Sequence, residues 1–307
     1  IRRNVVKRKG HIMFDRIFGN YLLKMGKLSK KQLENIFKKQ DSNRVRLGLI
    51  AMSEKLMTIK QADEVNKLQA SMDKRFGDIA IERGYLTEEQ VKHLLSLQGN
   101  IFLTFIQTVL DTGCLEMQQI NEALEEYQKE KGLTLSGMED LKSGEINRMV
   151  SVLMCGEEPI VQELVGIMLR TATRLVDNHM YVEEILKMDT YQAAQLSYQM
   201  QEGEHTILSA LSGSGEAMMK TAIGYIGKKF IDDNEDALDS LCELVNCVDG
   251  LLASDLSTKG IFLDMLSPEY TSKGATINGK NLFVIRMNIL EEKIDYIVSY
   301  DAEFMLN

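Results

Sequence analysis

The first half of the chain repeats itself every 29 residues, and this feature constrains the fold more than any other. Aligned at that spacing, segments 17–40, 46–69, 75–98 and 104–127 fall into register, with five residues between one segment and the next. Apolar residues recur at helical spacing on both sides of a central turn, so each segment predicts a short helix followed by a longer one. Hairpins of this size bury little surface alone, so we expect them to stack on their neighbours.

Each segment also carries the signals with which helices end and begin. A residue of left-handed backbone conformation is expected after the short helix, and glycine adopts that conformation most easily. The second segment has Lys55 at this position, and the others have Gly26, Gly84 and Gly113. Each longer helix is expected to begin with a capping box, a hydroxyl residue followed three positions later by glutamine. The pairs are Ser29 with Gln32, Thr58 with Gln61 and Thr87 with Gln90, whereas the fourth segment has Glu116 and Gln119 and so loses the hydroxyl.

Segments 46–69 and 75–98 share a further pattern of arginine, glycine and glutamine. They open with Arg-apolar-Gly and close with Gln. One interpretation is structural: glycine permits close helix approach, and the arginines and glutamines are solvated ends. The pattern R-L-G-x-x-L-x-x-x-G-x-L-x-x-x-x-L-x-x-x-L-x-x-Q, in units separated by five residues, also resembles the MshEN-type domain found at the N-terminus of type II secretion and pilus ATPases.

This resemblance implies a nucleotide-binding role, because several MshEN-type domains bind cyclic di-GMP. By resemblance, the ligand would be held by Arg46, Leu47, Gly48, Gln69, Arg75, Phe76, Gly77 and Gln98. Arginine suits this role, since its guanidinium group can pair with or stack on guanine and phosphate. The first segment has Ile17 in place of the arginine, and the fourth has lost the arginine, the glycine and the final glutamine. Only segments 46–69 and 75–98 therefore form a pair.

The composition is that of a folded protein large enough for two domains. The 307 residues are 44% hydrophobic and 26% charged, which allows each domain its own core. The net charge of -9 argues against a nucleic-acid backbone as the main partner, because such binding rests on clustered Lys and Arg. A protein or small-molecule partner is favoured instead. No apolar run is long enough to span a bilayer and no export leader is visible, so we expect a cytoplasmic protein.

Few residues suggest metal or nucleophilic chemistry. The cysteines lack CxxC spacing and are expected to be reduced, partly buried thiols; they are Cys114, Cys155, Cys242 and Cys247. The four histidines are scattered, and neither a zinc signature nor a Gly-rich phosphate loop is visible. We therefore expect no metal ligands and no cofactor held by this chain itself. The basic opening, residues 1–12, is expected to be a flexible leader or the end of an upstream segment.

The pattern changes after residue 130. Residues 131–147 are rich in Gly, Ser and charge, and they predict a linker between a helical repeat domain (13–130) and a second domain (148–307). In the second domain, helices are expected over 159–176, 214–227 and 234–256, and strand-like runs over 191–200, 204–212, 260–266, 281–290 and 293–304. This order predicts an α+β domain whose antiparallel sheet is packed by helices.

The last of these helices carries a polar stripe. Asp239, Glu243 and Asn246 are four and three positions apart, so they share one helix face; the opposite side has Leu238, Leu241, Cys242 and Val245. Such a stripe is also typical of a solvated face, because a Glu-x-x-Asn match arises easily by chance. The order of strand, helix, acidic linker and helix over 204–253 resembles the CheC/CheX/FliY family of receiver-domain phosphatases. Its signature is Asp or Ser, three residues, Glu, two residues, Asn.

The resemblance implies that Glu243 and Asn246 are catalytic and that Asp239 supports them. A phosphorylated receiver supplies the phospho-aspartate, a divalent ion and a lysine, so the phosphatase mainly has to orient a water molecule. A carboxamide suits this task because it both accepts and donates without a charge that repels the phosphoryl group. Glu243 would meet the lysine of the receiver. The helix expected over 159–176 has no Glu-x-x-Asn, so the chain is similar to CheX, with one site per domain.

Three hypotheses about function follow. The leading one is a chemotaxis or two-component signalling protein whose repeats sense or dock while its CheX-like domain dephosphorylates a response-regulator receiver. The alternative is a catalytically inactive adaptor whose repeats bind cyclic di-GMP or a protein partner. The third is a structural interaction module, in which exposed sheet edges would support a homodimer.

Overall fold

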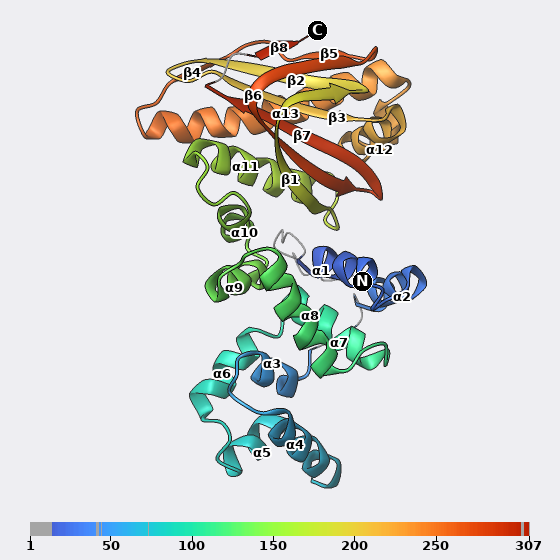
Figure 1. The fold of residues 1–307 in the computed structure, drawn as a ribbon, viewed down its shortest axis with the longest axis vertical. Helices are drawn as coiled ribbons and strands as arrows, with labels where there is room; N and C mark the ends of the chain where they lie inside the picture. Colours follow the sequence, from blue (N-terminus) through green and yellow to red (C-terminus); the bar gives the residue numbers. More distant parts are fainter. Residues whose placement is uncertain (1–13, 41–42, 44, 73, 302–303, 307) are drawn as a thin grey trace. The chain divides into compact units, whose positions relative to one another are not determined.

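The chain divides into an all-helical unit and an α+β unit. The computed structural model describes residues 14–306 apart from 41–42, 44, 73 and 302–303. The leader predicted over 1–12 lies outside the described residues. Contacts within the chain divide it between Ser143 and Gly144. Figure 1 shows helices alone from α1 to α9 and a mixed sheet-and-helix layer toward the C-terminus, so the predicted α+β class is confirmed.

Four helical hairpins make up most of the described helical unit. They are α1 (Phe14–Lys24) with α2 (Lys30–Gln40), α3 (Leu47–Ser53) with α4 (Ile59–Ser71), α5 (Phe76–Glu82) with α6 (Glu88–Ser96), and α7 (Ile101–Asp111) with α8 (Met117–Glu130). Each hairpin coincides with one of the segments that repeat every 29 residues. The predicted helix, turn and helix are confirmed in all four segments. The second helix is the longer one in three hairpins, whereas α1 and α2 have 11 residues each.

The turns and caps of the hairpins also follow the predictions. The three turn glycines have φ values of 65° to 69°, and Lys55 adopts the same conformation at 58°. In the capping box of α6, the Thr87 amide donates to Gln90 Oε1 at 2.8 Å and the Thr87 hydroxyl accepts from the Gln90 amide at 3.2 Å. The boxes of α2 and α4 have the same form. Glu116 keeps one of these bonds, since its amide donates to Gln119 Oε1 at 2.8 Å.

An aromatic cluster joins the first and last hairpins of the helical unit. Phe14, Phe18 and Tyr21 of α1 contact Phe102 of α7 and Tyr127 of α8, with ring centroids 5.0 to 6.2 Å apart. Aromatic pairs at this separation contribute dispersion and quadrupole energy beyond the area that they bury. The two ends of the repeat array thus stabilise each other directly.

The segment predicted as a linker contains an ordered helix. Helix α9 (Leu135–Ser143) occupies much of 131–147, and its Met138 and Leu141 side chains are buried. Tertiary burial of these two side chains outweighs the low helix propensity of the glycines and serines nearby. A break then follows at Gly144, whose φ of 71° is left-handed.

The α+β unit begins with two helices and continues with a sheet that two further helices interrupt. Its elements are α10 (Ile146–Leu153), α11 (Pro159–Leu175), β1 (Tyr181–Ala193), β2 (Gln195–Gly203), β3 (Ile207–Gly213), α12 (Gly215–Ile226), a 3-10 turn η1 (Lys228–Phe230), α13 (Asn234–Thr258), β4 (Leu263–Met265), β5 (Glu269–Thr271), β6 (Ala275–Ile289), β7 (Glu292–Tyr300) and β8 (Phe304–Leu306). The predicted helices correspond to α11, α12 and α13. No helix among the described residues has the length and apolarity needed to cross a membrane.

The described strands form one antiparallel sheet in the order β1-β6-β7-β3-β2-β4, with β5 also paired to β2 and β8 to β6. The predicted antiparallel arrangement is confirmed, but several strand boundaries differ and β5 lies outside every predicted run. The two largest differences concern β1 and β6. The run 191–200 is the end of β1 and the start of β2, which separate at Ala194, and β6 begins at Ala275 rather than 281. Both differences arise from the pairing of β1 with β6 along their length, a long-range contact that local patterning does not report.

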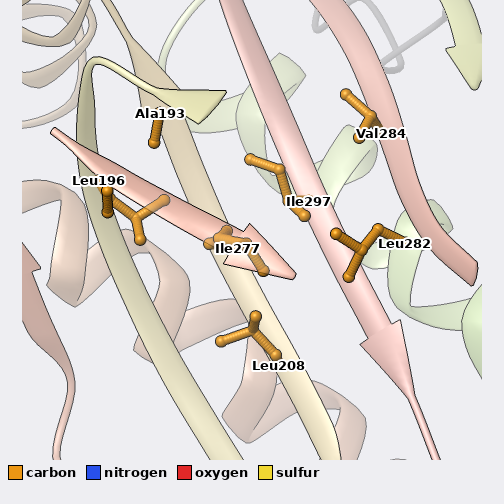
Figure 2. Close-up of a cluster of buried hydrophobic side chains, with 9 residues drawn as sticks. Ala193, Leu196, Leu208, Ile277, Leu282, Val284 and Ile297 are labelled. Atoms are coloured by element: carbon orange, nitrogen blue, oxygen red, sulfur yellow. The ribbon is translucent and has the colours of Figure 1, made fainter. Parts of the chain in front are cut away.

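The two faces of the sheet are covered differently. Helix α13 packs against β2 and β3, α12 packs against β7, and α11 packs against α13, so the helices cover one face (Figure 1). On the other face, Figure 2 shows Ile277, from the start of β6, among Leu196, Leu208 and Ile297. The register of β1 and β6 shifts between Met188 and Thr190, and such an irregularity lets strands bend. The start of β6 thus folds back over β2 and β3 and buries an apolar cluster on the face opposite the helices.

Candidate functional site

Helix α13 begins in a cluster of acidic residues. The Asp233 carboxylate accepts hydrogen bonds from the backbone amides of Glu235 at 2.8 Å and Asp236 at 3.0 Å. Such a cap satisfies free helical N–H groups, and negative charge is favoured at this end of the helix dipole. From there α13 runs along β2, burying Leu238, Leu241, Cys242, Leu244, Val245, Val248 and Leu252.

The predicted polar stripe lies on the outer side of α13. Asp239 and Glu243 are exposed and Asn246 is half-buried, whereas the four residues predicted for the opposite side are all buried. Among the described residues, neither Asp239 nor Glu243 takes part in an ion pair or a side-chain hydrogen bond. Both carboxylates are therefore accessible to a partner without the loss of an internal contact.

Asn246 is held from behind by the sheet. Its Oδ1 accepts a hydrogen bond from Nε2 of Gln199, on β2, at 2.9 Å. The same nitrogen donates to the main-chain oxygen of Leu266 at 2.7 Å. Gln199 is only 2% exposed, so its amide sits between sheet and helix rather than in solvent. The asparagine of the stripe is thus anchored, while the glutamate one turn earlier is not.

Two tyrosines flank the stripe. The pKa of Tyr225, on α12, is raised by burial and then by Cys247 and Glu243. The pKa of Tyr270, on β5, is raised by desolvation and then by Glu235 and Asp239. Each ring therefore lies within electrostatic reach of one carboxylate of the stripe. Carboxylate, carboxamide and partly exposed aromatic groups lie together on this surface.

A buried acid lies beneath the stripe on the same helix. Asp249 is fully buried, and neither of its carboxylate oxygens has a hydrogen-bond partner among the described residues. Burial raises its pKa to about 8, and the nearby Ser209 hydroxyl lowers it only in part. Tyr296 donates to Ser209 Oγ at 3.3 Å, and burial followed by Asp249 raises the pKa of Tyr296 well above its usual range. Sequence reasoning missed this acid, because one Asp in an acidic helix gives no signal.

In the helical unit, the structure brings together the openings of the two Arg-apolar-Gly segments. A Cβ at Gly48 would lie 3.0 Å from the Phe76 ring, and one at Gly77 would lie 3.6 Å from Leu47 and 2.9 Å from Val91. Each opening therefore packs on the other, and glycine is required by close approach. This agrees with the structural interpretation of these glycines.

The polar residues predicted to hold a nucleotide have varied surroundings. Arg46 is exposed and its Nη2 lies 3.1 Å from Asp111 Oδ1, an ion pair that a ligand would have to displace. Arg75 and Gln98 are exposed, and Gln69 Nε2 donates to the Lys74 carbonyl at 3.4 Å.

The helical unit also has a cavity of about 330 Å³, but it lies elsewhere. Leu49, Met52, Phe102 and Met138 are among the residues that line it. None of the eight residues predicted for the nucleotide lines this cavity.

The described residues contain no cluster of three or more His, Cys, Asp or Glu side chains able to hold a metal ion. All four cysteines are free thiols, with Cys242 buried and Cys155 exposed, so Cys155 departs from the predicted partial burial.

Gln199 and Leu266 are site residues that sequence reasoning missed. Polar residues alternate along β2 at Ser197, Gln199 and Gln201, which is a typical pattern for a solvated strand face. In the structure that face is buried under α13, and the side chains bond to the helix or lie unpaired. The signal that could have indicated the contact with α13 is this set of alternating polar residues on β2, a strand with neighbours on both sides in the sheet.

Comparisons with known proteins give likenesses for the α+β unit alone. No family model matches the sequence, and no curated protein matches it. Among solved structures, a putative chemotaxis protein from Desulfovibrio vulgaris Hildenborough is 11% identical, with a TM-score of 0.41, over 47% of this chain and 97% of that one. The chemotaxis protein CheX from Desulfovibrio desulfuricans is 12% identical, with a TM-score of 0.41, over 47% of this chain and 99% of that one.

A third similar structure is the CheX–CheY–BeF3–Mg complex from Borrelia burgdorferi, 13% identical with a TM-score of 0.34, over 48% of this chain and 99% of that one.

Proposed function

We propose that the α+β unit dephosphorylates the aspartyl phosphate of a response-regulator receiver domain. The observation that supports this most directly is the arrangement on α13: Asn246 is half-buried and anchored by Gln199, and Glu243 is exposed one turn earlier. The pattern of Asp239, Glu243 and Asn246 resembles the signature of CheC/CheX/FliY phosphatases. A chemotaxis or two-component signalling role follows from that activity.

The chemistry required of this chain is limited. Water attacks the phosphorus, the bond between phosphorus and the aspartyl oxygen breaks, and inorganic phosphate leaves with the protons of the water. The receiver would supply the divalent ion and a lysine. Asn246 would orient the water and the phosphoryl group, which is a recognised source of rate. Glu243 would pair with the lysine, and Asp239 would support docking from the next turn.

The test compares phosphate release from a panel of phosphorylated receivers by the parent and by Asn246→Ala. Ser254→Ala, an exposed change two turns further along α13, is the matched control. Orientation of the water is worth on the order of 100-fold in rate, so the Asn246 variant should lose about that factor while the control retains activity. Equal rates for the parent and Asn246→Ala would refute the assignment.

A second proposal concerns the repeats: a nucleotide such as cyclic di-GMP binds where the openings of segments 46–69 and 75–98 meet. The reciprocal packing of Gly48 on Phe76 and of Gly77 toward Leu47 supports the pairing that such a site needs. Calorimetry with cyclic di-GMP tests it, with Arg75→Ala as the variant expected to lose binding. The absence of heat and of a thermal shift at high nucleotide concentration would remove this proposal and leave a protein partner for the repeats.

A further inference from the structure

The side chain of Gln199 connects the candidate catalytic asparagine to the backbone of a third segment. Its Nε2 donates to Asn246 Oδ1 at 2.9 Å and to the main-chain oxygen of Leu266 at 2.7 Å. Gln199 lies on β2, Asn246 lies on α13, and Leu266 directly follows β4. Three elements therefore meet at one amide nitrogen.

The Leu266 carbonyl determines the polarity of this connection. A main-chain oxygen only accepts hydrogen bonds, so the Gln199 atom that faces it has to be the amide nitrogen. That nitrogen also faces Asn246, which must therefore meet it with Oδ1. If the Asn246 carboxamide were turned by 180°, two N–H donors would oppose each other. The Nδ2 amino group of Asn246 is thus the end of the carboxamide remote from Gln199.

The elements that carry this connection are fixed on several sides. The strand β2 pairs with β3 along one edge, with Gln199 opposite Ser209, and with β4 and β5 along the other. Ser197, two residues earlier on the same face, donates to the Leu238 carbonyl at 2.8 Å and ties α13 to β2 about two turns upstream of Asn246. Gln199 is 2% exposed, so water does not compete for its amide. It has little freedom to follow Asn246 into another orientation.

We propose that Gln199 is a positioning residue, which turns the Nδ2 hydrogens of Asn246 toward the docked receiver. This inference rests on the proposed phosphatase function. N–H donors in that place favour the anionic phosphoryl oxygens and hold the attacking water through its oxygen. A carbonyl oxygen turned outward would instead present negative partial charge to the phosphoryl group. Gln199 thereby selects the productive one of the two carboxamide orientations.

Gln199→Met tests the role in the full chain, because it keeps an unbranched side chain of similar length but removes the donor. Gln201→Met is the matched control: Gln201 is buried on the same face of β2, and its amide atoms have no hydrogen-bond partner among the described residues. A misplaced Asn246 should lower kcat on a phosphorylated receiver by about 10- to 100-fold with KM little changed. The control should keep the kcat of the parent.

Gln199→Glu adds a readout that a merely structural role would not move. When it is ionised, the introduced carboxylate only accepts, so Asn246 would turn its Nδ2 toward it and its Oδ1 toward the receiver. When it is protonated, the introduced acid has one donor again. The ratio of variant to parent kcat should therefore fall as the pH rises through the pKa of the introduced acid. A ratio that is constant with pH in a folded variant would contradict the proposal.

Nuclear magnetic resonance of the Asn246 side-chain amide tests whether Gln199 holds this carboxamide, even if a variant or the parent is inactive. Its signal is assigned by its loss in Asn246→Ala. The amide should be as restrained as the backbone in the parent and in Gln201→Met, and mobile in Gln199→Met. Unchanged restraint and unchanged kcat in Gln199→Met would overturn the positioning role while leaving the phosphatase intact. If the parent released no phosphate from any receiver, the proposed function would fail, and the amide dynamics alone would decide whether Gln199 holds Asn246.

Discussion

The capping boxes of the helical unit and the candidate site of the α+β unit depend on polar contacts over different distances along the chain. In the repeats, the capping bonds join residues three positions apart, such as Thr87 with Gln90. In the α+β unit, the contact between Gln199 and Asn246 joins residues 47 positions apart. Local polar contacts recur with the sequence pattern and stabilise single helices. The long-range contacts appear only once the sheet and α13 are assembled, and they are the ones that position the candidate site.

The largest expected effect concerns the buried acid of the α+β unit. The pKa of Asp249 is raised to about 8 from an ordinary value near 4, so the folded state retains a proton that the unfolded chain releases between these values. This contribution to stability is full below about pH 4 and is lost progressively as the pH rises toward 8, by on the order of 1 kcal/mol per pH unit. Asp249→Asn cannot ionise and escapes that loss.

We therefore expect Asp249→Asn to be more stable than the parent near pH 8, with a difference that shrinks as the pH falls toward 4. Urea unfolding of both proteins at several pH values measures it. Asp239→Asn, on the exposed side of the same helix, is the control, because substitutions at exposed positions change stability little. A pH-independent difference for Asp249→Asn would show that the buried carboxyl does not titrate as described.

A smaller effect is expected from a cap in the repeats. Thr87→Ala removes the hydroxyl that accepts from the Gln90 amide, which should cost about 1 kcal/mol of unfolding free energy. Ser96→Ala at the end of the same helix is a control, since the exposed Ser96 hydroxyl donates to the His93 carbonyl and caps no helix N-terminus. Thermal unfolding compares the two variants. Equal stability of the two variants would mean that the hydroxyl of the capping box does not stabilise the helix.

The smallest effect is a gain in stability. Lys55 has a φ of 58°, a conformation that costs a residue with a Cβ roughly 1 kcal/mol or more. Lys55→Gly should relieve most of this, offset by the greater freedom of glycine in the unfolded chain, for a net gain of up to about 1 kcal/mol.

The reverse change sharpens the test of the turn. Gly84→Ala places a Cβ where no atom beyond its chain neighbours lies within 4 Å, so a loss of stability comes from the backbone conformation. We expect this variant to be less stable than the parent by about 1 kcal/mol. Stabilisation by Gly84→Ala, or destabilisation by Lys55→Gly, would contradict the account of the repeat turns.

These contrasts explain what could be predicted from the sequence. The hairpins, the capping boxes and α13 follow from spacings of three and four residues, which are visible in one sequence. The extent of β1 and β6 could not be predicted, because it depends on their mutual pairing. The exposed face of α13 was predicted from Asp239, Glu243 and Asn246. The hydrogen bond from Gln199 that holds Asn246 was not predicted. In the sequence, Gln199 resembles a solvated strand residue, and only the topology places α13 over it.

The central claim is that the Asn246 carboxamide drives hydrolysis of a receiver's aspartyl phosphate. The most direct measurement is phosphate release from phosphorylated receiver domains with the parent and Asn246→Ala side by side, both shown to be folded. The account predicts faster release with the parent and loss of that acceleration, on the order of 100-fold, in the variant. Acceleration that persists in Asn246→Ala, or none from the parent with any receiver in the panel, would contradict it.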